Sequence, residues 1–416
     1  MVSRTARPTP PPSGAPVPRA HLGAGGPKGA RAPSSLLEDL VRSAVQTPSL
    51  SAKYERHVAG DTFSLRDLPV LTHQELTAAT QEALALYSDG DSGVLWAHGG
   101  TLETPGLSLL PEGMFASEIL SSWNPLAPQD VLANLHPPGR LRPDHYFFNR
   151  FAAAAGATVL PIGDLPEGDA DGWLAFLSRQ GVTALAAPPR TLARLLGGVA
   201  SGRPIPWLRT LLLGGATHDT TPDTLLGAHF PYTDTWRLYG TPASWVIGQH
   251  SPQCLADVYH PLPHQMVEVV DGRLLLTTLS TARLPPLIRY DTQERAEFTR
   301  CSCGQRGPAF RVFGPTPPSF RFCGRTIDAR ELVALATACD EVAQAQVAVT
   351  PEQRIQLRVR LTPDALDDHH SRAWVRFRVL EHHLVLADCV AEQPEAFDVV
   401  TVDRPLGSSP LASEES

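Results

Sequence analysis

Four residues in the second half of the chain have the side chains of a tetrahedral metal site: Cys254, His260, Cys301 and Cys303. Five residues separate the first cysteine from the histidine, and one serine separates the last two cysteines. Thiolates and imidazole are the ligands of closed, four-coordinate zinc sites. Because the cysteines cluster, metal binding is favoured over disulfides in a reducing compartment. The pattern predicts a structural zinc that joins two loops; two pairs of free thiols are the alternative.

A second group of residues has the small and aromatic side chains that suit a nucleotide base. One apolar run ends at Gly214 and Gly215, and a later strand-like run ends at Tyr239, Gly240 and Thr241. Glycine lets the backbone approach a ligand closely, and an aromatic ring offers a flat surface for stacking. The pattern indicates a base-binding shelf at the Tyr-Gly pair. A packed strand end is the alternative interpretation.

Another apolar run, which begins at Val94, leads into a short polar segment: His98, Gly99, Gly100 and Thr101. The backbone N–H groups of such a segment can bind phosphate. An ordinary hairpin loop explains the segment at least as well, because it has only two glycines and one hydroxyl group. No lysine follows Lys53, so the rest of the chain supplies no catalytic lysine.

The overall composition excludes some classes of partner. The chain has 416 residues, a net charge of -8 and a pI near 6.0, so it lacks the basic surface typical of proteins that bind nucleic acids or anionic membranes. No apolar run is long enough to cross a bilayer, and the N-terminus lacks the apolar core of a secretory signal. We therefore expect a cytoplasmic protein with small-molecule partners, no nucleic acid and no membrane.

The length predicts two domains with disordered ends. Residues 1–33 are rich in Pro, Gly and Ala, which indicates a disordered tail. Over residues 34–312, apolar strand-like runs alternate with helical segments, as in an α/β domain with a largely parallel sheet. Residues 313–405 predict a smaller α+β domain, and residues 406–416 predict a frayed tail.

Two groups of side chains in predicted helices have both a structural and a functional interpretation. Phe147, Phe148 and Phe151 could line an acyl pocket, although aromatics at helical spacing more often belong to the core. Four histidines in a long predicted helix are expected to be surface residues and not metal ligands: His369, His370, His382 and His383.

The order of several short segments is more specific: SLRDLPVLTHQEL, DVLANL, AAAAGATVLP, TALAAPPRTLARL, LLLGGA, WRLYG, PLIRY and CSCG. In this order, they resemble the phenylacetate–CoA ligase branch of the adenylate-forming superfamily, over nearly all of the chain from Leu36 to about Arg404. The resemblance implies a large α/β AMP-binding-like domain with mixed and parallel sheets, a small mobile α+β C-terminal domain, and an active site between them. The implied reaction joins a carboxylic acid to ATP, releases pyrophosphate and passes the acyl group to the thiol of CoA or a carrier protein.

The resemblance also implies a nucleotide pocket formed by Thr101, Gly214, Gly215, Tyr239, Gly240, Thr241 and Glu294. In such a pocket Tyr239 stacks on adenine, and the two threonines bind phosphate. Glu294, one methylene longer than the usual aspartate, holds the ribose. Some relatives resemble the chain in having a Cys, a His and a Cys-x-Cys in the order of the predicted zinc ligands. The implied cofactors are ATP and magnesium, beside the structural zinc.

Several positions depart from the family's pattern on the ATP side. Leu102 replaces a usual glycine of the phosphate loop, and Glu103 brings negative charge close to the phosphates. Ala243 stands where the family has the glutamate that helps to hold magnesium. Pro315 replaces the hinge arginine and stiffens a position that must rotate. The family's C-terminal lysine has no counterpart, and the last segment offers only Arg404 as a cation.

Two functional classes follow from these observations. The first is an AMP-forming acid–thiol ligase that activates an aromatic or other small carboxylic acid. The second is a degenerate homologue without ATP-dependent activity, which acts as a nucleotide-independent enzyme, an acyl-ligand binder or a partner subunit. One oxyanion-type contact contributes about 2.7–4 kcal/mol to a transition state, so the departures weigh against adenylation. A homodimer is expected from the relatives alone.

Overall fold

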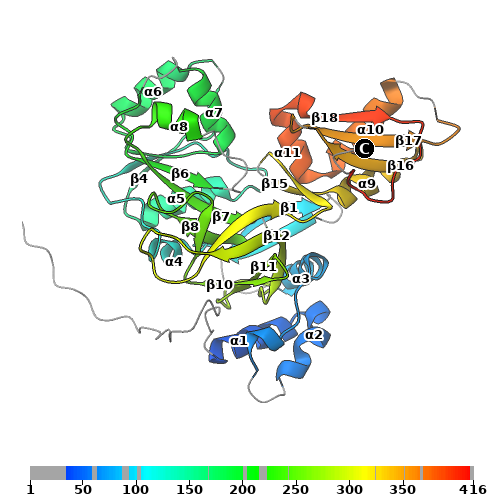
Figure 1. The fold of residues 1–416 in the computed structure, drawn as a ribbon, viewed down its shortest axis with the longest axis horizontal. Helices are drawn as coiled ribbons and strands as arrows, with labels where there is room; N and C mark the ends of the chain where they lie inside the picture. The colour runs from blue at the N-terminus through cyan, green and yellow to red at the C-terminus, as the bar shows by residue number, and fades with distance from the viewer. Residues whose placement is uncertain are drawn as a thin grey trace, which may run out of the picture.

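The computed structural model describes residues 34–58, 63–86, 93–100, 105–166, 168–199, 204–214, 223–241, 243–323, 325–350, 352–365 and 369–412 (Figure 1). The predicted tail over residues 1–33 lies outside these ranges. Thr101 and Gly215 of the predicted nucleotide pocket also lie outside them, as do Leu102 and Glu103.

Among the described residues, a mixed sheet of eleven strands forms the centre of the N-terminal domain. One half of it contains the parallel strands β3 (Val131–Asn134), β4 (Thr158–Pro161), β5 (Ala184–Ala186), β6 (Thr210–Gly214) and β7 (Asp234–Thr241). The connecting helices are α5 (Asp144–Ala154), α6 (Ala170–Arg179), α7 (Pro189–Gly197) and α8 (Asp223–His229). Leu211, Leu212 and Leu213 form a continuous apolar run in β6, and all three are buried, as expected for a strand covered on both faces. The predicted α/β fold is therefore confirmed.

The other half of the sheet is antiparallel and follows in sequence. It contains β8 (Trp245–His250), β9 (Val258–Pro261), β10 (Gln265–Val270), β11 (Arg273–Thr278), β12 (Tyr290–Thr299) and β13 (Ala309–Pro315). Strand β9 pairs with both β8 and β13, so β13 joins the sheet next to an earlier strand. Pro315, at the predicted hinge, is thus the last residue of a strand in the large sheet.

Further elements pack around this sheet. They are the helices α1 (Ser34–Val45), α2 (Pro48–Val58), α3 (His73–Leu86) and α4 (Ala116–Leu120), the 3₁₀ turn η1 (Leu65–Asp67), and the hairpin of β1 (Gly93–Gly100) with β2 (Pro105–Pro111). Leu37, Leu40 and Val41 recur at helical spacing, and this face of α1 is buried against the core that contains Tyr54 of α2. In Figure 1, α1 and α2 lie at the lower edge, and α6, α7 and α8 cover the upper end.

The C-terminal domain lies to the right in Figure 1 and has its own hydrophobic core. Its elements are β14 (Ser319–Phe322), β15 (Arg325–Asp328), α9 (Ala329–Thr337), β16 (Val342–Val349), β17 (Ile355–Leu361), α10 (His369–His382), α11 (Leu384–Glu392), η2 (Pro394–Ala396) and β18 (Phe397–Thr401). Ile355, Leu357 and Val359 alternate along β17 and are buried, so one face of this three-stranded sheet packs on the helices. The domain has the predicted α+β character.

Two features of this domain differ from the sequence-based expectations. The predicted long helix is divided into α10 and α11, because the His383 side chain caps α11 by accepting a hydrogen bond from the backbone N–H of Leu386 at 3.1 Å. His383 is therefore buried and not a surface residue. In addition, residues 406–412 are not frayed: the N–H of Val347 donates to the carbonyl of Pro410, and the N–H of Ala412 donates to the carbonyl of Val347, both at 2.8 Å.

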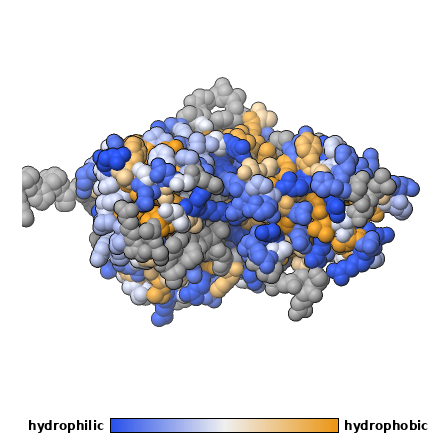
Figure 2. All heavy atoms as spheres, turned by 90° about the horizontal axis from the view of Figure 1, so that it is seen from above, coloured by the Kyte–Doolittle hydropathy of each residue, from blue (hydrophilic) through white to orange (hydrophobic). Residues whose placement is uncertain are grey.

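Figure 2 shows the molecule from above. Hydrophilic residues cover much of the surface between the two domains, and hydrophobic residues form separate patches among them. In the described part of the chain, no helix combines the length and the apolar character that crossing a membrane requires.

Candidate functional site

A cavity of about 190 Å³ lies where the N-terminal and C-terminal domains meet. Each parallel strand of the large sheet contributes at or just beyond its carboxyl end: His136 after β3, Asp164 after β4, Arg190 after β5, Gly214 at the end of β6 and Thr241 at the end of β7. In open α/β sheets, ligands bind at this edge. The sheet topology therefore marks the cavity as the candidate site.

The floor of the cavity is apolar. It includes Trp96, Phe147, Phe148, Leu238 and Trp245. Two of the three phenylalanines considered for an acyl pocket thus line the cavity, whereas the third, Phe151, belongs to the buried core behind it. An apolar cavity of about 150 Å³ can hold a benzene ring, so this one has room for a small aromatic or aliphatic acyl group.

The rim of the cavity carries cationic side chains. Arg142 bridges the two domains: it donates to Asp388 at 3.0 Å and to Glu392 at 2.9 Å, both on α11. Arg194 is paired with Asp164. Arg190 differs from these two, because its buried Nη1 has no hydrogen-bond partner among the described residues. Of these three guanidinium groups, that of Arg190 is therefore the best placed to receive an anionic group of a ligand.

His136 is a lining residue that the sequence reasoning missed. Only 4% of its surface is exposed, its ring stacks on Phe148 with centroids 4.7 Å apart, and no described group is hydrogen-bonded to its Nε2. Burial lowers the pKa of His136 to about 4, so the ring is neutral at pH 7 and its Nε2 can hydrogen-bond a ligand. Its position two residues beyond an apolar strand is the signal that could have identified it.

We expect His136 to contribute to acid sensitivity. Its pKa is depressed in the folded protein, so the unfolded chain binds a proton that the folded chain does not bind, and stability is lost as the pH falls from about 6.5 towards 4. Unfolding of His136→Gln at pH 5 should take up about one proton fewer than unfolding of the wild type. The slope of the unfolding free energy against pH should therefore fall by about 1.4 kcal/mol per pH unit. Urea unfolding at pH 5, 6 and 7 measures this slope, and an unchanged slope would contradict the assignment.

The predicted nucleotide residues that the structure describes fall into two groups. Gly214, Gly240 and Thr241 line the cavity. Tyr239 does not: it is fully buried, with its ring centroid 5.2 Å from Tyr259. A Cβ at Gly240 would lie 2.2 Å from the carbonyl oxygen of Trp245, so the tight hairpin explains this glycine without a ligand.

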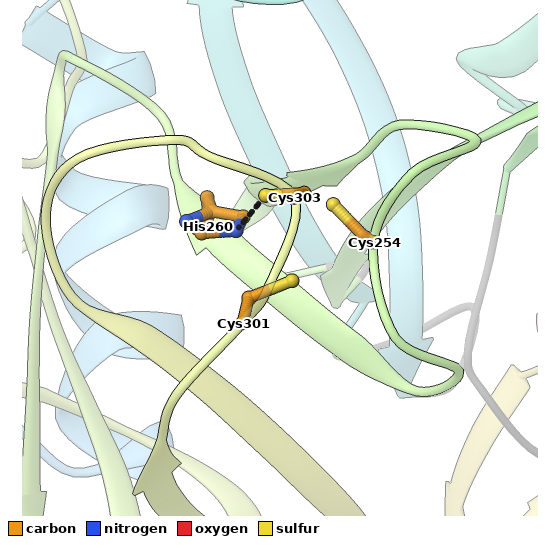
Figure 3. Close-up of side chains that lie close together, drawn as sticks. All are labelled: Cys254, His260, Cys301 and Cys303. Carbon is orange, nitrogen blue, oxygen red and sulfur yellow. Dashed lines mark hydrogen bonds between the residues drawn. The ribbon is translucent and has the colours of Figure 1, made fainter.

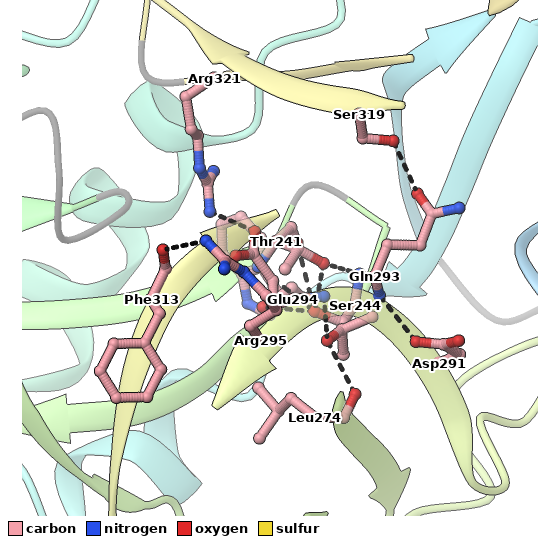
Figure 4. A network of polar contacts seen from close by, with 12 residues as sticks. Thr241, Ser244, Leu274, Asp291, Gln293, Glu294, Arg295, Phe313, Ser319 and Arg321 are labelled. Atoms are coloured by element: carbon pink, nitrogen blue, oxygen red, sulfur yellow. Dashed lines mark hydrogen bonds and ion pairs between the residues drawn. The ribbon is translucent and has the colours of Figure 1, made fainter. Parts of the chain in front are cut away.

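Glu294, predicted to hold ribose, is engaged by the C-terminal domain. Only 1% of its surface is exposed, and its carboxylate forms an ion pair with Arg321 of β14 (Figure 4). Burial raises the pKa of the Glu294 carboxyl, while Arg321 and Arg295 oppose the shift. Its Oε2 has no hydrogen-bond partner among the described residues. Glu294 is absent from the cavity lining, so the structure does not bring it together with Gly214, Gly240 and Thr241.

The four predicted metal ligands come together away from the cavity. One ligand atom of each residue lies within 4.8 Å of the others, and the Cys303 Sγ is 3.2 Å from the His260 Nε2 (Figure 3). Cys254 follows β8, His260 lies on β9, and Cys301 and Cys303 lie on the loop between β12 and β13. Zinc bonds of about 2.0–2.3 Å separate tetrahedral ligand atoms by roughly 3.3–3.8 Å, so the side chains are close to the required geometry.

Backbone N–H groups also point at two of these sulfur atoms. The N–H of Ser251 donates to the Cys254 Sγ, and the N–H of Leu255 donates to the Cys301 Sγ, both at 3.4 Å. Such donors stabilise negative charge on sulfur, which is the state of a cysteine that binds a metal.

Comparison with known proteins shows which fold this is. No family model and no curated protein matches the sequence. The structure of 2-hydroxyisobutyryl-CoA ligase with 2-HIB-AMP and CoA in the thioesterification state is similar, with a TM-score of 0.70 and 17% identity over 91% of this chain and 88% of the ligase. The amide bond synthetase McbA from Marinactinospora thermotolerans has a TM-score of 0.54 and 18% identity over 76% of this chain and 66% of McbA.

A malonyl-CoA ligase complex with methylmalonyl-CoA and AMP has a TM-score of 0.52, with 18% identity over 77% of this chain and 74% of that ligase. These likenesses show the fold of adenylate-forming ligases. The TM-score falls to 0.55 and 0.54 for the open and postadenylation states of 2-hydroxyisobutyryl-CoA ligase. The two domains of this chain are therefore arranged more like those of the thioesterification state.

Proposed function

We propose that the protein is an acid–thiol ligase-like protein that holds a small carboxylic acid in activated form and passes its acyl group to a thiol. The cavity between the domains carries this proposal: it lies at the carboxyl ends of the parallel strands, has an apolar floor, and has a cationic rim at Arg190. The fold supports it, because a similar structure holds 2-HIB-AMP and CoA. In this assignment the acyl chain packs on Phe147, Phe148 and Trp245.

The acyl-transfer half of this chemistry has more support in the structure than the ATP-consuming half. Glu294 is paired with Arg321, Ala243 stands where the resembled family has a glutamate that helps to hold magnesium, and no lysine follows Lys53. These observations favour a second candidate function, in which the protein accepts a preformed acyl adenylate or acyl thioester and does not use ATP. ATP and magnesium belong only to the first candidate, full ligase activity.

Calorimetric titration separates the two candidates. The ligands are ATP with magnesium, AMP, and a non-hydrolysable phenylacetyl-adenylate mimic. Binding of ATP and the mimic, with pyrophosphate release on adding an aromatic acid, supports the full ligase. Binding of the mimic without ATP supports the second candidate. If neither a nucleotide nor an acyl thioester binds, the proposal is wrong and the cavity serves another ligand.

A substitution in the cavity tests whether the mimic binds there. A Cβ at Gly214 makes only ordinary contacts with the Phe148 ring, at 3.8 Å, but a valine would add branches to the lining of a small cavity. We expect Gly214→Val to weaken binding of the mimic at least tenfold, or about 1.4 kcal/mol. Gly113→Val is the matched control, because a Cβ at Gly113 has no atom within 4 Å. Equal affinities for the two variants would place the ligand elsewhere.

We also propose that the four ligands Cys254, His260, Cys301 and Cys303 hold one structural zinc ion. The donor set and the separations of the ligand atoms fit a tetrahedral site. The ion would connect the segment after β8 with the loop before β13 and has no role in catalysis, because the ligands are absent from the cavity lining.

A further inference from the structure

Two cysteines meet at the wall that the C-terminal domain contributes to the cavity. Cys323 lies in the turn between β14 and β15, and Cys389 lies in α11. Both line the cavity, and their thiols are hydrogen-bonded to each other. Neither takes part in the cluster of metal ligands, and none of the chain's six cysteines forms a disulfide.

The surroundings of this pair favour a thiolate at Cys389. Its pKa is lowered first by the hydrogen bond with Cys323 and then by the positive charges of Arg325 and Arg190, while burial and Glu392 oppose the shift. Both arginines line the same cavity. Cys339, in the core of the same domain, provides the contrast, because burial raises the pKa of its thiol. A cysteine activated by nearby cations and a donor is a nucleophile.

We propose that Cys389 is an internal acyl acceptor: its sulfur attacks the carbonyl carbon of an activated acyl group held in the cavity and becomes S-acylated. The inference rests on the proposed function, because it needs an activated acyl group in the cavity. The chain would then supply a thiol of its own at the place where such proteins bring an acyl group and an external thiol together.

The step is balanced without an oxidant or a reductant. A carbon–sulfur bond forms to Cys389, and the bond from the acyl carbon to the phosphate oxygen of an adenylate breaks. The electron pair leaves on that oxygen as AMP. With an acyl thioester, the carbon–sulfur bond of the donor breaks instead, and the leaving thiolate takes a proton from Cys323 or water. Arg190, whose Nη1 has no described partner, is placed to bind the negative charge that develops.

The experiment uses the full chain, purified with a reducing agent and then incubated with the phenylacetyl thioester of N-acetylcysteamine. Intact mass should show one phenylacetyl group per chain, released by neutral hydroxylamine, and peptide mapping should place it on Cys389. The acylation rate should fall at least tenfold in Cys389→Ser. In Cys323→Ala the rate should fall less, and its pH profile should shift upward because the thiolate loses its donor. Cys339→Ser, outside the cavity, should react like the wild type.

Separate readouts keep this inference distinct from the proposed function. If the acyl-adenylate mimic binds but the thioester leaves no adduct on Cys389, the internal acceptor is excluded and the proposed function stands. The inference is also overturned if Cys389→Ser is acylated as fast as the wild type, or if the adduct maps to a cysteine of the metal cluster. A disulfide between Cys323 and Cys389 in protein that is kept reduced would also overturn the inference, because neither sulfur would then be free to attack the acyl group. Arg190→Gln covers the case in which Cys389→Ser fails to fold: slower acylation at an unchanged melting temperature supports the inference, and an unchanged rate contradicts it.

Discussion

Cys301→Ser is expected to lose the metal and to lower the melting temperature by roughly 6–12 °C. The proposed zinc connects two loops at the antiparallel half of the large sheet, so losing a ligand releases both loops and leaves thiolates held close together. A loss of about 3 kcal/mol is a modest share of what structural zinc contributes in small domains, and each kcal/mol lowers the melting temperature by about 2–4 °C in a domain of this size. Elemental analysis of the wild type should give about one zinc per chain.

Two controls make this result specific. Chelation of the wild type should lower the melting temperature by a similar amount, and added zinc should restore it. Cys339→Ser removes a buried thiol in the other domain, so it should lose some stability but keep its full metal content. If Cys301→Ser kept both the zinc and the wild-type melting temperature, the three cysteines would be free thiols beside His260, and the zinc would be bound elsewhere.

The parts of the fold that could be predicted rest on local patterns. The buried leucines of β6 and the alternating residues of β17 have the spacing of their strands, so their elements are visible in the sequence. The proposed metal ligands were recognisable because residue type and short spacing are local as well. The capping role of His383 was not predicted, because a histidine pair in a polar helix has the same pattern whether or not one ring turns inward.

The parts that could not be predicted depend on contacts between segments that are far apart in the sequence. Cys323 and Cys389 are isolated cysteines in the sequence, and only the packing of α11 against the β14–β15 turn within the C-terminal domain brings them together. The pairing of Arg321 with Glu294 crosses from one domain to the other. His136 and Arg190 could have been predicted, because each follows an apolar strand, and ligands bind at the carboxyl ends of parallel strands.

Arg321→Met is expected to destabilise the protein by about 3–5 kcal/mol near pH 7. Arg321 is the partner of a carboxylate that is almost fully buried, and removing one member of such a pair leaves a charge without compensation. The double variant Arg321→Met with Glu294→Gln should recover most of the loss, because it buries no charge. Urea unfolding of the two single variants and the double variant gives the coupling free energy, and additive effects would show that the pair is not a unit.

The pH dependence of the same variant has a definite sign. Burial already raises the folded-state pKa of Glu294 above its ordinary value of 4.5, and losing Arg321 removes a group that opposes this shift. In the window above pH 4.5, the folded chain therefore binds more protons than the unfolded chain, so stability falls as the pH rises. The loss of unfolding free energy caused by Arg321→Met should therefore be smaller at pH 5 than at pH 7. In the Glu294→Gln background, the effect of Arg321→Met should not depend on pH.

The affinity of the same variants for AMP tests the predicted role of Glu294 in nucleotide binding. If Glu294 is a ribose ligand that Arg321 covers in the present arrangement of the domains, Arg321→Met should bind AMP more tightly at pH 7 than the wild type does, and Glu294→Gln should cancel the gain. If AMP affinity is unchanged in a folded Arg321→Met variant, the carboxylate serves only to join the two domains. The chain would then have kept the position of the ribose ligand but used it to fix the arrangement that resembles the thioesterification state.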